Sequence, residues 1–188
     1  SENGTASCVV SAASSNDHVF YVTASYVNIT GLTVKNATGS TGIFSETSYC
    51  NISGNNATNN YYGIYLFNSS NNTLTSNTAS NNTYYGIYLH DSCNNNTLTG
   101  NTVSNNSLMG IYLNSSSNNT LTNNNASYNS YGIYLYYSSN NNLTSNTASN
   151  NSYGIYLESS SNNNTHTNNN ASYNSYGIYL YSSSSNNN

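Results

Sequence analysis

The chain alternates hydrophobic and polar residues in short stretches that recur at a nearly constant interval. The tetrapeptide Gly-Ile-Tyr-Leu begins at Gly63, Gly86, Gly110, Gly132, Gly154 and Gly177, and a variant, Gly-Ile-Phe-Ser, begins at Gly42. Successive starts are 21, 23, 24, 22, 22 and 23 residues apart. A fixed period of this length is typical of proteins built from stacked repeats.

Each repeat contains three short stretches with the period of a β-strand. After Gly63, Ile64 and Leu66 alternate with Tyr65 and Phe67, which predicts a strand with one buried face. Thr-Leu-Thr at 73–75 places one Leu inward, and Thr-Ala-Ser at 78–80 places one Ala inward. No interval has the 3.6-residue periodicity of a helix.

This pattern predicts an all-β fold: a single-stranded parallel β-helix of about eight coils of 21–24 residues, with three short strands per coil. The general crossover rule makes it right-handed. Residues 18–188 are assigned to the repeats, and residues 1–17 to a lead-in or a first coil.

Asparagines align at the predicted corners. Their columns are Asn72, Asn96, Asn119, Asn141 and Asn164; Asn77, Asn101, Asn124, Asn146 and Asn169; and Asn82, Asn106, Asn129, Asn151 and Asn174. Asn tolerates left-handed backbone geometry at tight corners. Stacked at about 4.8 Å per coil, its amides can also hydrogen-bond along the column. These residues are therefore interpreted as structural ladders.

Charge is almost absent, at 3% of residues, with one Lys or Arg against five Asp or Glu. A single cation, Lys35, cannot neutralise the phosphates of a nucleic acid. No apolar run reaches the length of a membrane span, and no signal peptide is visible. The low charge favours export, because net charge helps to keep cytosolic proteins soluble.

Many Asn-X-Ser/Thr triplets are candidate N-glycosylation sites in an exported chain. They begin at Asn3, Asn28, Asn36, Asn51, Asn56, Asn68, Asn71, Asn81, Asn95, Asn105, Asn114, Asn118, Asn125, Asn142, Asn150, Asn163 and Asn170. A sequence rich in Asn, Ser and Thr also produces such triplets by chance.

The order of motifs, Gly-Ile-Tyr-Leu, then Ser-Asn-Asn-Thr-Leu-Thr-X-Asn, then Ala-Ser-Asn-Asn, resembles the NosD-type parallel β-helix repeats, also described as carbohydrate-binding and sugar-hydrolase repeats. Residues 27–37 resemble the opening coils of that family, and the resemblance covers residues 18–188. Such repeats are frequent in surface-layer and other cell-surface proteins of methanogenic archaea. They serve lyases, epimerases, copper-site maturation and inert stalks alike, so the resemblance specifies fold more than function.

The ionisable residues give little support for a catalytic site. The carboxylates are Glu2, Asp17, Glu46, Asp91 and Glu158. Glu46 and Glu158 lie five coils apart, roughly 24 Å at the coil rise, which is too far for a glycosidase pair. We therefore expect no catalytic residues and no enzyme.

Metal and cofactor sites are not expected either. His18, His90 and His166 fall in different coils, and Met109 is the only thioether. His166 replaces an inward Leu and is interpreted as a tolerated core substitution. The copper association that the resemblance implies has no ligand set to carry over.

Three cysteines, Cys8, Cys50 and Cys93, leave the disulfide question open. Cys50 and Cys93 are about two coils apart, roughly 10 Å, too far for an internal bridge. An intermolecular disulfide, free buried thiols in place of Ser or Asn in corner columns, and a Cys8–Cys50 pair all remain possible.

Two outward columns are candidates for interactions. A Tyr stripe comprises Tyr65, Tyr88, Tyr112, Tyr134, Tyr156 and Tyr179, and such a stripe suits protein packing or stacking on sugar rings. It also fits simple β-propensity on a solvated face. Thr-X-Thr columns run through residues 73–75, 97–99, 120–122 and 165–167 and resemble the ice-binding face of certain β-solenoids.

We therefore expect an exported, non-enzymatic structural protein of a surface layer, sheath or extracellular filament. Open strand edges and the lack of repulsive charge favour end-to-end stacking of copies. The expected partners are other copies of the chain and N-linked glycans, with no nucleic acid and no membrane span in this segment. The alternatives are a carbohydrate-binding module that uses the Tyr stripe and an ice-binding solenoid that uses the Thr columns.

Overall fold

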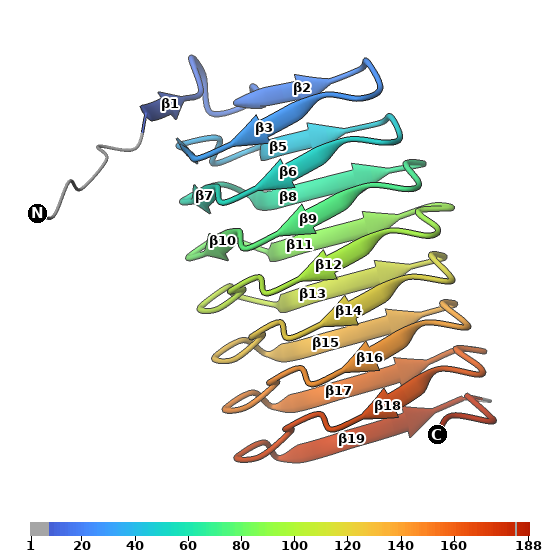
Figure 1. Ribbon diagram of the computed structural model, residues 1–188. Coiled ribbons are helices and arrows are strands. Elements are labelled where there is room, and N and C mark those ends of the chain that lie inside the picture. The colour runs from blue at the N-terminus through green and yellow to red at the C-terminus, as the bar shows by residue number, and fades with distance from the viewer. Residues whose placement is uncertain (1–7, 183) are drawn as a thin grey trace, which may run out of the picture.

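A computed structural model describes residues 8–182 and 184–188 as a ladder of stacked coils (Figure 1). The coils contribute strands to two parallel sheets that run along the stack and to a third, shorter one in the first coils. Strands one coil apart pair in register, so that Ile87 pairs with Ile64 on one side and with Ile111 on the other. Equivalent residues of successive repeats therefore lie directly above one another.

The eight-stranded sheet, here the Tyr sheet, carries the Gly-Ile-Tyr-Leu motifs. Its strands are β2 (Phe20–Val22), β5 (Thr41–Ser45), β8 (Tyr62–Phe67), β11 (Tyr85–His90), β13 (Met109–Asn114), β15 (Tyr131–Tyr136), β17 (Tyr153–Glu158) and β19 (Tyr176–Tyr181). The seven-stranded Thr sheet consists of β3 (Asn28–Thr30), β6 (Asn51–Ser53), β9 (Thr73–Thr75), β12 (Thr97–Thr99), β14 (Thr120–Thr122), β16 (Asn142–Thr144) and β18 (Thr165–Thr167).

The third sheet is shorter than the other two. Its strands are β1 (Cys8–Ser11), β4 (Leu32–Lys35), β7 (Asn56–Thr58) and β10 (Thr78–Ser80). From Thr78 onward, single parallel bridges continue it through Thr102, Asn125, Thr147 and Asn170. In the later coils the third strand of the repeat is therefore reduced to a single bridging residue. Residues 8–11 already form the first strand of this sheet, because β1 pairs with β4.

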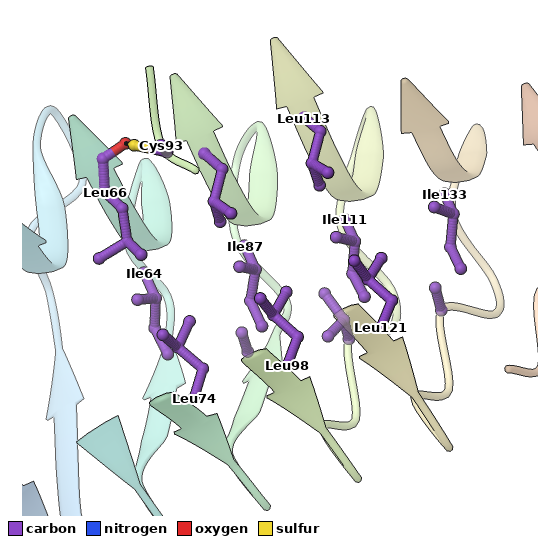
Figure 2. Close-up of a cluster of buried hydrophobic side chains, with 14 of the residues drawn as sticks. Ile64, Leu66, Leu74, Ile87, Cys93, Leu98, Ile111, Leu113, Leu121 and Ile133 are labelled. Carbon is purple, nitrogen blue, oxygen red and sulfur yellow. Dashed lines mark hydrogen bonds between the residues drawn. The ribbon is translucent and has the colours of Figure 1, made fainter. Parts of the chain in front are cut away.

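The core is a set of aliphatic columns along the axis of the stack. Figure 2 shows Ile64, Ile87 and Ile111 of the Tyr sheet facing Leu74 and Leu98 of the Thr sheet. All five side chains are fully buried. Burying one such side chain contributes about 1.5–3 kcal/mol, but only when the neighbouring coils cover it.

The recurring Gly of the motif is required by close packing between coils. A Cβ on Gly132 would lie 2.6 Å from the carbonyl oxygen of Gly154 and 2.7 Å from Nδ2 of Asn151. No larger residue fits at this point without shifting a neighbouring coil.

The three asparagine columns form buried amide ladders. The Oδ1 of Asn101 accepts hydrogen bonds from the backbone N–H and the side chain of Asn77, at 2.9 and 3.0 Å. The side chain of Asn77 in turn donates to the Ile52 carbonyl at 2.8 Å. Each amide therefore joins three coils and satisfies backbone groups that the corners leave unpaired.

The sequence analysis assigned the left-handed backbone conformation to the ladder asparagines, but the residue before each of them adopts it. Positive φ angles occur immediately before the ladder asparagines, for example at Ser76, Gly100 and Asn123, where φ is 54°, 64° and 55°. The ladder asparagine itself points its side-chain amide into the interior of the stack. The expectation that ladder asparagines adopt the left-handed conformation is thus corrected: the preceding residue makes the turn.

Candidate functional site

The outer face of the Tyr sheet carries the stacked tyrosines and, in contact with tyrosines of this sheet, several His and Glu side chains. The Tyr stripe lies in register, so each ring faces the ring of the next coil. Ring centroids along the stripe, from Tyr65 to Tyr179, are 4.7, 4.9, 4.9, 4.9 and 5.4 Å apart. The rings form one continuous stack.

Further aromatic and thioether side chains cover the stripe. A neighbouring column on the same face, one of whose rings is Tyr131, packs against it. As a result Tyr88, Tyr112 and Tyr134 are only 8%, 9% and 9% exposed. The sequence analysis placed these rings outward on an accessible face, but the faces of these three are covered by other rings.

Burial keeps the stacked phenols protonated at neutral pH. It raises the pKa of Tyr65 to about 12 and that of Tyr62 to about 12. The pKa values of Tyr88 and Tyr112 are also raised, mainly by desolvation. These hydroxyls therefore act as hydrogen-bond donors rather than as anions.

Three phenols of the Tyr sheet form a hydrogen bond with a His or Glu side chain of the next coil. Tyr65 Oη lies 3.0 Å from His90 Nδ1, and Tyr21 Oη lies 2.7 Å from Glu46 Oε1. Tyr134 donates to Glu158 in the same way.

Sequence reasoning missed these pairs because it compared ionisable residues with one another and not with tyrosines. The signal was present in the spacing. The partners are 25, 25 and 24 residues apart, which in each case is one coil plus two positions.

At His90 a third side chain, that of Asp91, adjoins the Tyr65–His90 pair. The Nε2 of His90 lies 3.5 Å from Asp91 Oδ1, with the two side chains 29% and 54% exposed. The ring of Tyr88 stacks on the imidazole at 5.1 Å. Tyr65, His90 and Asp91 thus form a connected set that opens to solvent.

The other two histidines have unrelated surroundings. His18 Nδ1 lies 2.9 Å from Ser40 Oγ and stacks on Phe44. His166 occupies the inward position of β18, and both of its ring nitrogens are buried without a hydrogen-bond partner. Desolvation lowers the pKa of His166.

Two of the cysteines occupy buried corner columns. Cys50 stands where later coils have Asn, and its N–H donates to Asn72 Oδ1 at 2.8 Å. Cys93 stands in a buried Ser column, and its thiol donates to the Leu66 carbonyl at 3.2 Å. Both are buried and free, whereas Cys8 is free and exposed. Of the alternatives left open, free buried thiols in corner columns describe Cys50 and Cys93.

The candidate glycan acceptors and the ladder asparagines differ in exposure. Every acceptor in the described residues is exposed except Asn114, which is partly buried; Asn3 lies outside the described residues. At the corners the two kinds are adjacent, as with exposed Asn71 and buried Asn72. Occupancy of the acceptors stays a prediction, as does ice binding by the Thr columns, which align in register.

Comparison with known proteins identifies the family. The sequence matches the family described as periplasmic copper-binding protein (NosD) over residues 3–140 and 91–188. The chain belongs to the NosD family. The resemblance drawn from its repeat motifs is confirmed, and with it membership of an extracytoplasmic β-helix family. A search of curated proteins gave no match.

Solved structures share the fold of this NosD chain at low identity. The mannuronan C-5 epimerase AlgE4 A-module of Azotobacter vinelandii is 19% identical, with a TM-score of 0.71 over 87% of this chain and 53% of its own. The periplasmic alginate epimerase AlgG is 20% identical, with a TM-score of 0.70 over 91% and 47%. Pectate lyase Pel9A is 18% identical, with a TM-score of 0.63 over 91% and 55%.

These matches confirm the right-handed parallel β-helix, and the chain spans about half the length of these structures. They also correct the expectation that this chain is not an enzyme, because two epimerases and a lyase share its fold. The expectation relied on scarce carboxylates and cations, and it overlooked tyrosine and histidine as acid–base groups.

The copper in the family description can be tested against the residues present. Soft thiolate, thioether and imidazole ligands suit copper. Burial raises the pKa of the Cys93 thiol to about 11, and the thiol donates to the carbonyls of Leu66 and His90. The described residues contain no group of three His, Cys, Asp or Glu side chains able to hold a metal. They do not fit a copper centre.

Proposed function

We propose that this NosD-family chain is a scaffold of the cell surface or extracellular space that lengthens by stacking one copy on the end of another. The observation that carries the proposal is the in-register parallel pairing of near-identical strands, in which a Gly-Ile-Tyr-Leu strand such as β15 pairs with an equivalent strand on each side. Ile178 and Leu180 of β19 are 49% and 46% exposed, whereas the equivalent residues of the inner coils are fully buried.

The first coils carry a hollow of about 460 Å³ lined by apolar side chains that include Phe20, Val22 and Ile29. β2 and β19 are the two edges of one parallel sheet. A second copy that pairs its β2 with β19 would continue the sheet and cover Ile178 and Leu180. Such a head-to-tail contact leaves a free end on each copy, so it extends into a filament.

Sedimentation velocity over a wide concentration range, with electron microscopy of the same samples, tests the proposal. We expect species that grow with concentration and rods one coil stack wide. The double variant Ile178→Lys/Leu180→Lys places charges in the end surface and should remain monomeric. Thr144→Lys, on the outer face of the Thr sheet, is the matched control and should assemble normally. A wild-type protein that stays monomeric throughout contradicts the proposal.

Glycan binding on the Tyr sheet is a second candidate. It is favoured by the matched structures, whose names give mannuronan, alginate and pectate as their substrates, and by the row of hydroxyl groups along the stacked tyrosines. Because the ring faces are covered, we expect binding through the hydroxyls. Glycan-array binding should therefore fall for the double variant Tyr112→Phe/Tyr134→Phe, which keeps the stack. Tyr128→Phe, at an exposed corner, is the control.

The glycan partners expected from the sequence are also proposed here. The exposed acceptors at the corners are open to a glycosyltransferase, while the ladder asparagines beside them are not. Intact-mass analysis of native material before and after enzymatic deglycosylation will test this, and an unmodified mass will rule it out.

A further inference from the structure

Tyr26 and Tyr49 form a stacked ring pair at the corner between the Tyr sheet and the Thr sheet. Tyr26 lies between β2 and β3, and Tyr49 lies at the same corner of the next coil, between β5 and β6 (Figure 1). The two ring centroids are 5.3 Å apart and the ring planes differ by 12°. In the same two turns, the side-chain oxygens of Ser25 and Thr47 are 2.7 Å apart. The register of β3 with β6 therefore holds two phenol rings face to face.

Both rings are open to solvent, in contrast to the buried part of the Tyr stripe. Tyr26 is 75% exposed and Tyr49 is 53% exposed. Among the ring pairs of the described residues, this is the pair in which both members are exposed. Tyr88 and Tyr112 stack at a similar distance, 4.9 Å, but they are buried under other rings. A reagent in solution can reach both corner rings, and each has room to turn about its side-chain bonds.

The backbone that carries the two rings lies in the left-handed region. φ is 64° at Tyr26 and 63° at Tyr49, a conformation that bulky residues rarely adopt. At this corner the later coils have asparagines with positive φ, namely Asn71, Asn95, Asn118, Asn140 and Asn163. Asparagine tolerates this conformation well. The two tyrosines therefore carry a backbone cost that asparagine avoids, and such a cost points to a use for the side chains.

We propose that Tyr26 and Tyr49 are a modification site at which a one-electron oxidant joins the two rings into dityrosine. The oxidant is of the haem peroxidase class, with hydrogen peroxide as the electron acceptor. The reaction needs one copy of the chain and no glycan, so it is independent of end-to-end stacking and of glycan binding.

The coupling removes two hydrogen atoms from the ring pair. Each phenol loses one electron and one proton and becomes a phenoxyl radical. The rings turn from face to face to edge to edge, and a bond forms between one Cε carbon of each. The hydrogens on these two carbons move to the phenol oxygens, which restores both aromatic rings and both hydroxyl groups. The two electrons and two protons reduce one hydrogen peroxide to two water molecules.

The link would hold two neighbouring coils together covalently. In the unmodified chain, packing and the pairing of β2 with β5 and of β3 with β6 join these coils. A covalent bond also restricts the unfolded chain, and for a loop of this length the loop-entropy model gives roughly 10²-fold in the opening equilibrium. Native-state hydrogen exchange of these four strands should slow by up to that factor after oxidation. Exchange of β17 and β19 should stay unchanged.

The position of Lys35 makes the cross-link simple to detect. It is the single Lys or Arg of the chain and lies between the two tyrosines, so a protease that cleaves after Lys cuts the denatured chain into two fragments. We expect dilute, monomeric protein to gain dityrosine fluorescence on treatment with peroxidase and hydrogen peroxide. After reduction and cleavage, its two fragments should stay joined on a denaturing gel. Peptide mass spectrometry should locate the bond at Tyr26 and Tyr49.

Tyr26→Phe and Tyr49→Phe should each release the two fragments, because phenylalanine forms no phenoxyl radical. Tyr128→Phe and Tyr173→Phe are matched controls and should keep the fragments joined. Both control tyrosines are exposed, with φ of 60° and 58°, and neither contacts another ring in the part of the chain that the structure describes. Circular dichroism confirms that each variant is folded. Fragments that separate after oxidation of the wild type overturn the proposal, as does a joined product that persists in Tyr49→Phe.

Discussion

The middle and the end of the stack carry the same tetrapeptide with different exposure. Ile111 and Leu113 in β13 are fully buried, whereas Ile178 and Leu180 in β19 are 49% and 46% exposed. The sequence of a coil therefore does not decide how much its side chains contribute to stability. The contribution comes from the coils on either side, as expected of a quasi-one-dimensional protein.

The sharpest test of this comparison is the same truncation in both places. Leu113→Ala removes a fully buried side chain from a packed column and should lower the free energy of unfolding by about 2–5 kcal/mol. Leu180→Ala should cost about 1 kcal/mol or less, because much of that side chain already contacts water. Urea unfolding at concentrations where the protein is monomeric measures both. Equal losses would show that the last coil is covered in solution.

The recurring Gly gives a second matched pair. A Cβ at Gly132 meets the Gly154 carbonyl at 2.6 Å, but at Gly177 the nearest atom is the Ala171 carbonyl at 3.2 Å. Gly132→Ala should destabilise the fold by about 1–3 kcal/mol through overpacking.

At Gly177→Ala the loss should be much smaller, because a β-strand tolerates Ala and the nearest atom to the added Cβ is 3.2 Å away. Thermal unfolding of the two variants side by side provides the measurement. A Gly132→Ala protein as stable as wild type would show that neighbouring coils separate easily.

A smaller effect is expected from His166, the one position where the aliphatic column of the Thr sheet becomes polar. Its two ring nitrogens are buried without partners, and such groups cost about 1–3 kcal/mol. His166→Leu continues the column of Leu143 and should stabilise the last coils by about 1 kcal/mol. Native-state hydrogen exchange resolves this local effect.

The same residue gives the last coils a pH dependence. Burial lowers the pKa of His166 in the folded state, so below the ordinary value of 6.5 the unfolded chain binds the proton more readily. Stability is therefore full above pH 6.5 and falls as the pH drops toward the folded-state pKa. Exchange protection of residues 165–181 should decrease on acidification in wild type and not in His166→Leu. Parallel behaviour of the two proteins would assign the pH effect to another group.

Most of the fold could be predicted from the sequence, because every repeat has the same pattern of inward aliphatic residues and corner asparagines. The inward Leu of each Thr-Leu-Thr stretch and the Asn columns follow directly from the coil length. The narrowing of the third strand after β10 was not predictable, since Thr78 and Thr102 lie in nearly the same local sequence. The position of the left-handed residue was also missed, because two adjacent asparagines, such as Asn71 and Asn72, are equivalent in propensity.

The candidate site was harder to predict because it depends on contacts between coils. Tyr65 and His90 are 25 residues apart, and only the register of β8 against β11 shows that they meet. The burial of Tyr112 likewise results from rings on neighbouring strands. Alternation within one strand places a side chain outward but does not say what covers it. Sequence reasoning thus located the Tyr face and misjudged its chemistry.

The smallest expected effect concerns the cysteines and leaves stability unchanged. Cys8 is exposed, whereas Cys50 and Cys93 lie in the buried columns of the inner coils. Under native conditions a thiol reagent should modify Cys8 at once and the other two only after unfolding, since burial also raises the pKa of Cys93 to about 11 and the thiolate is the reactive form. Peptide mass spectrometry after brief labelling distinguishes the three. Rapid labelling of Cys93 would mean that the central coils open as readily as the last one, and the contrast between middle and end would then be wrong.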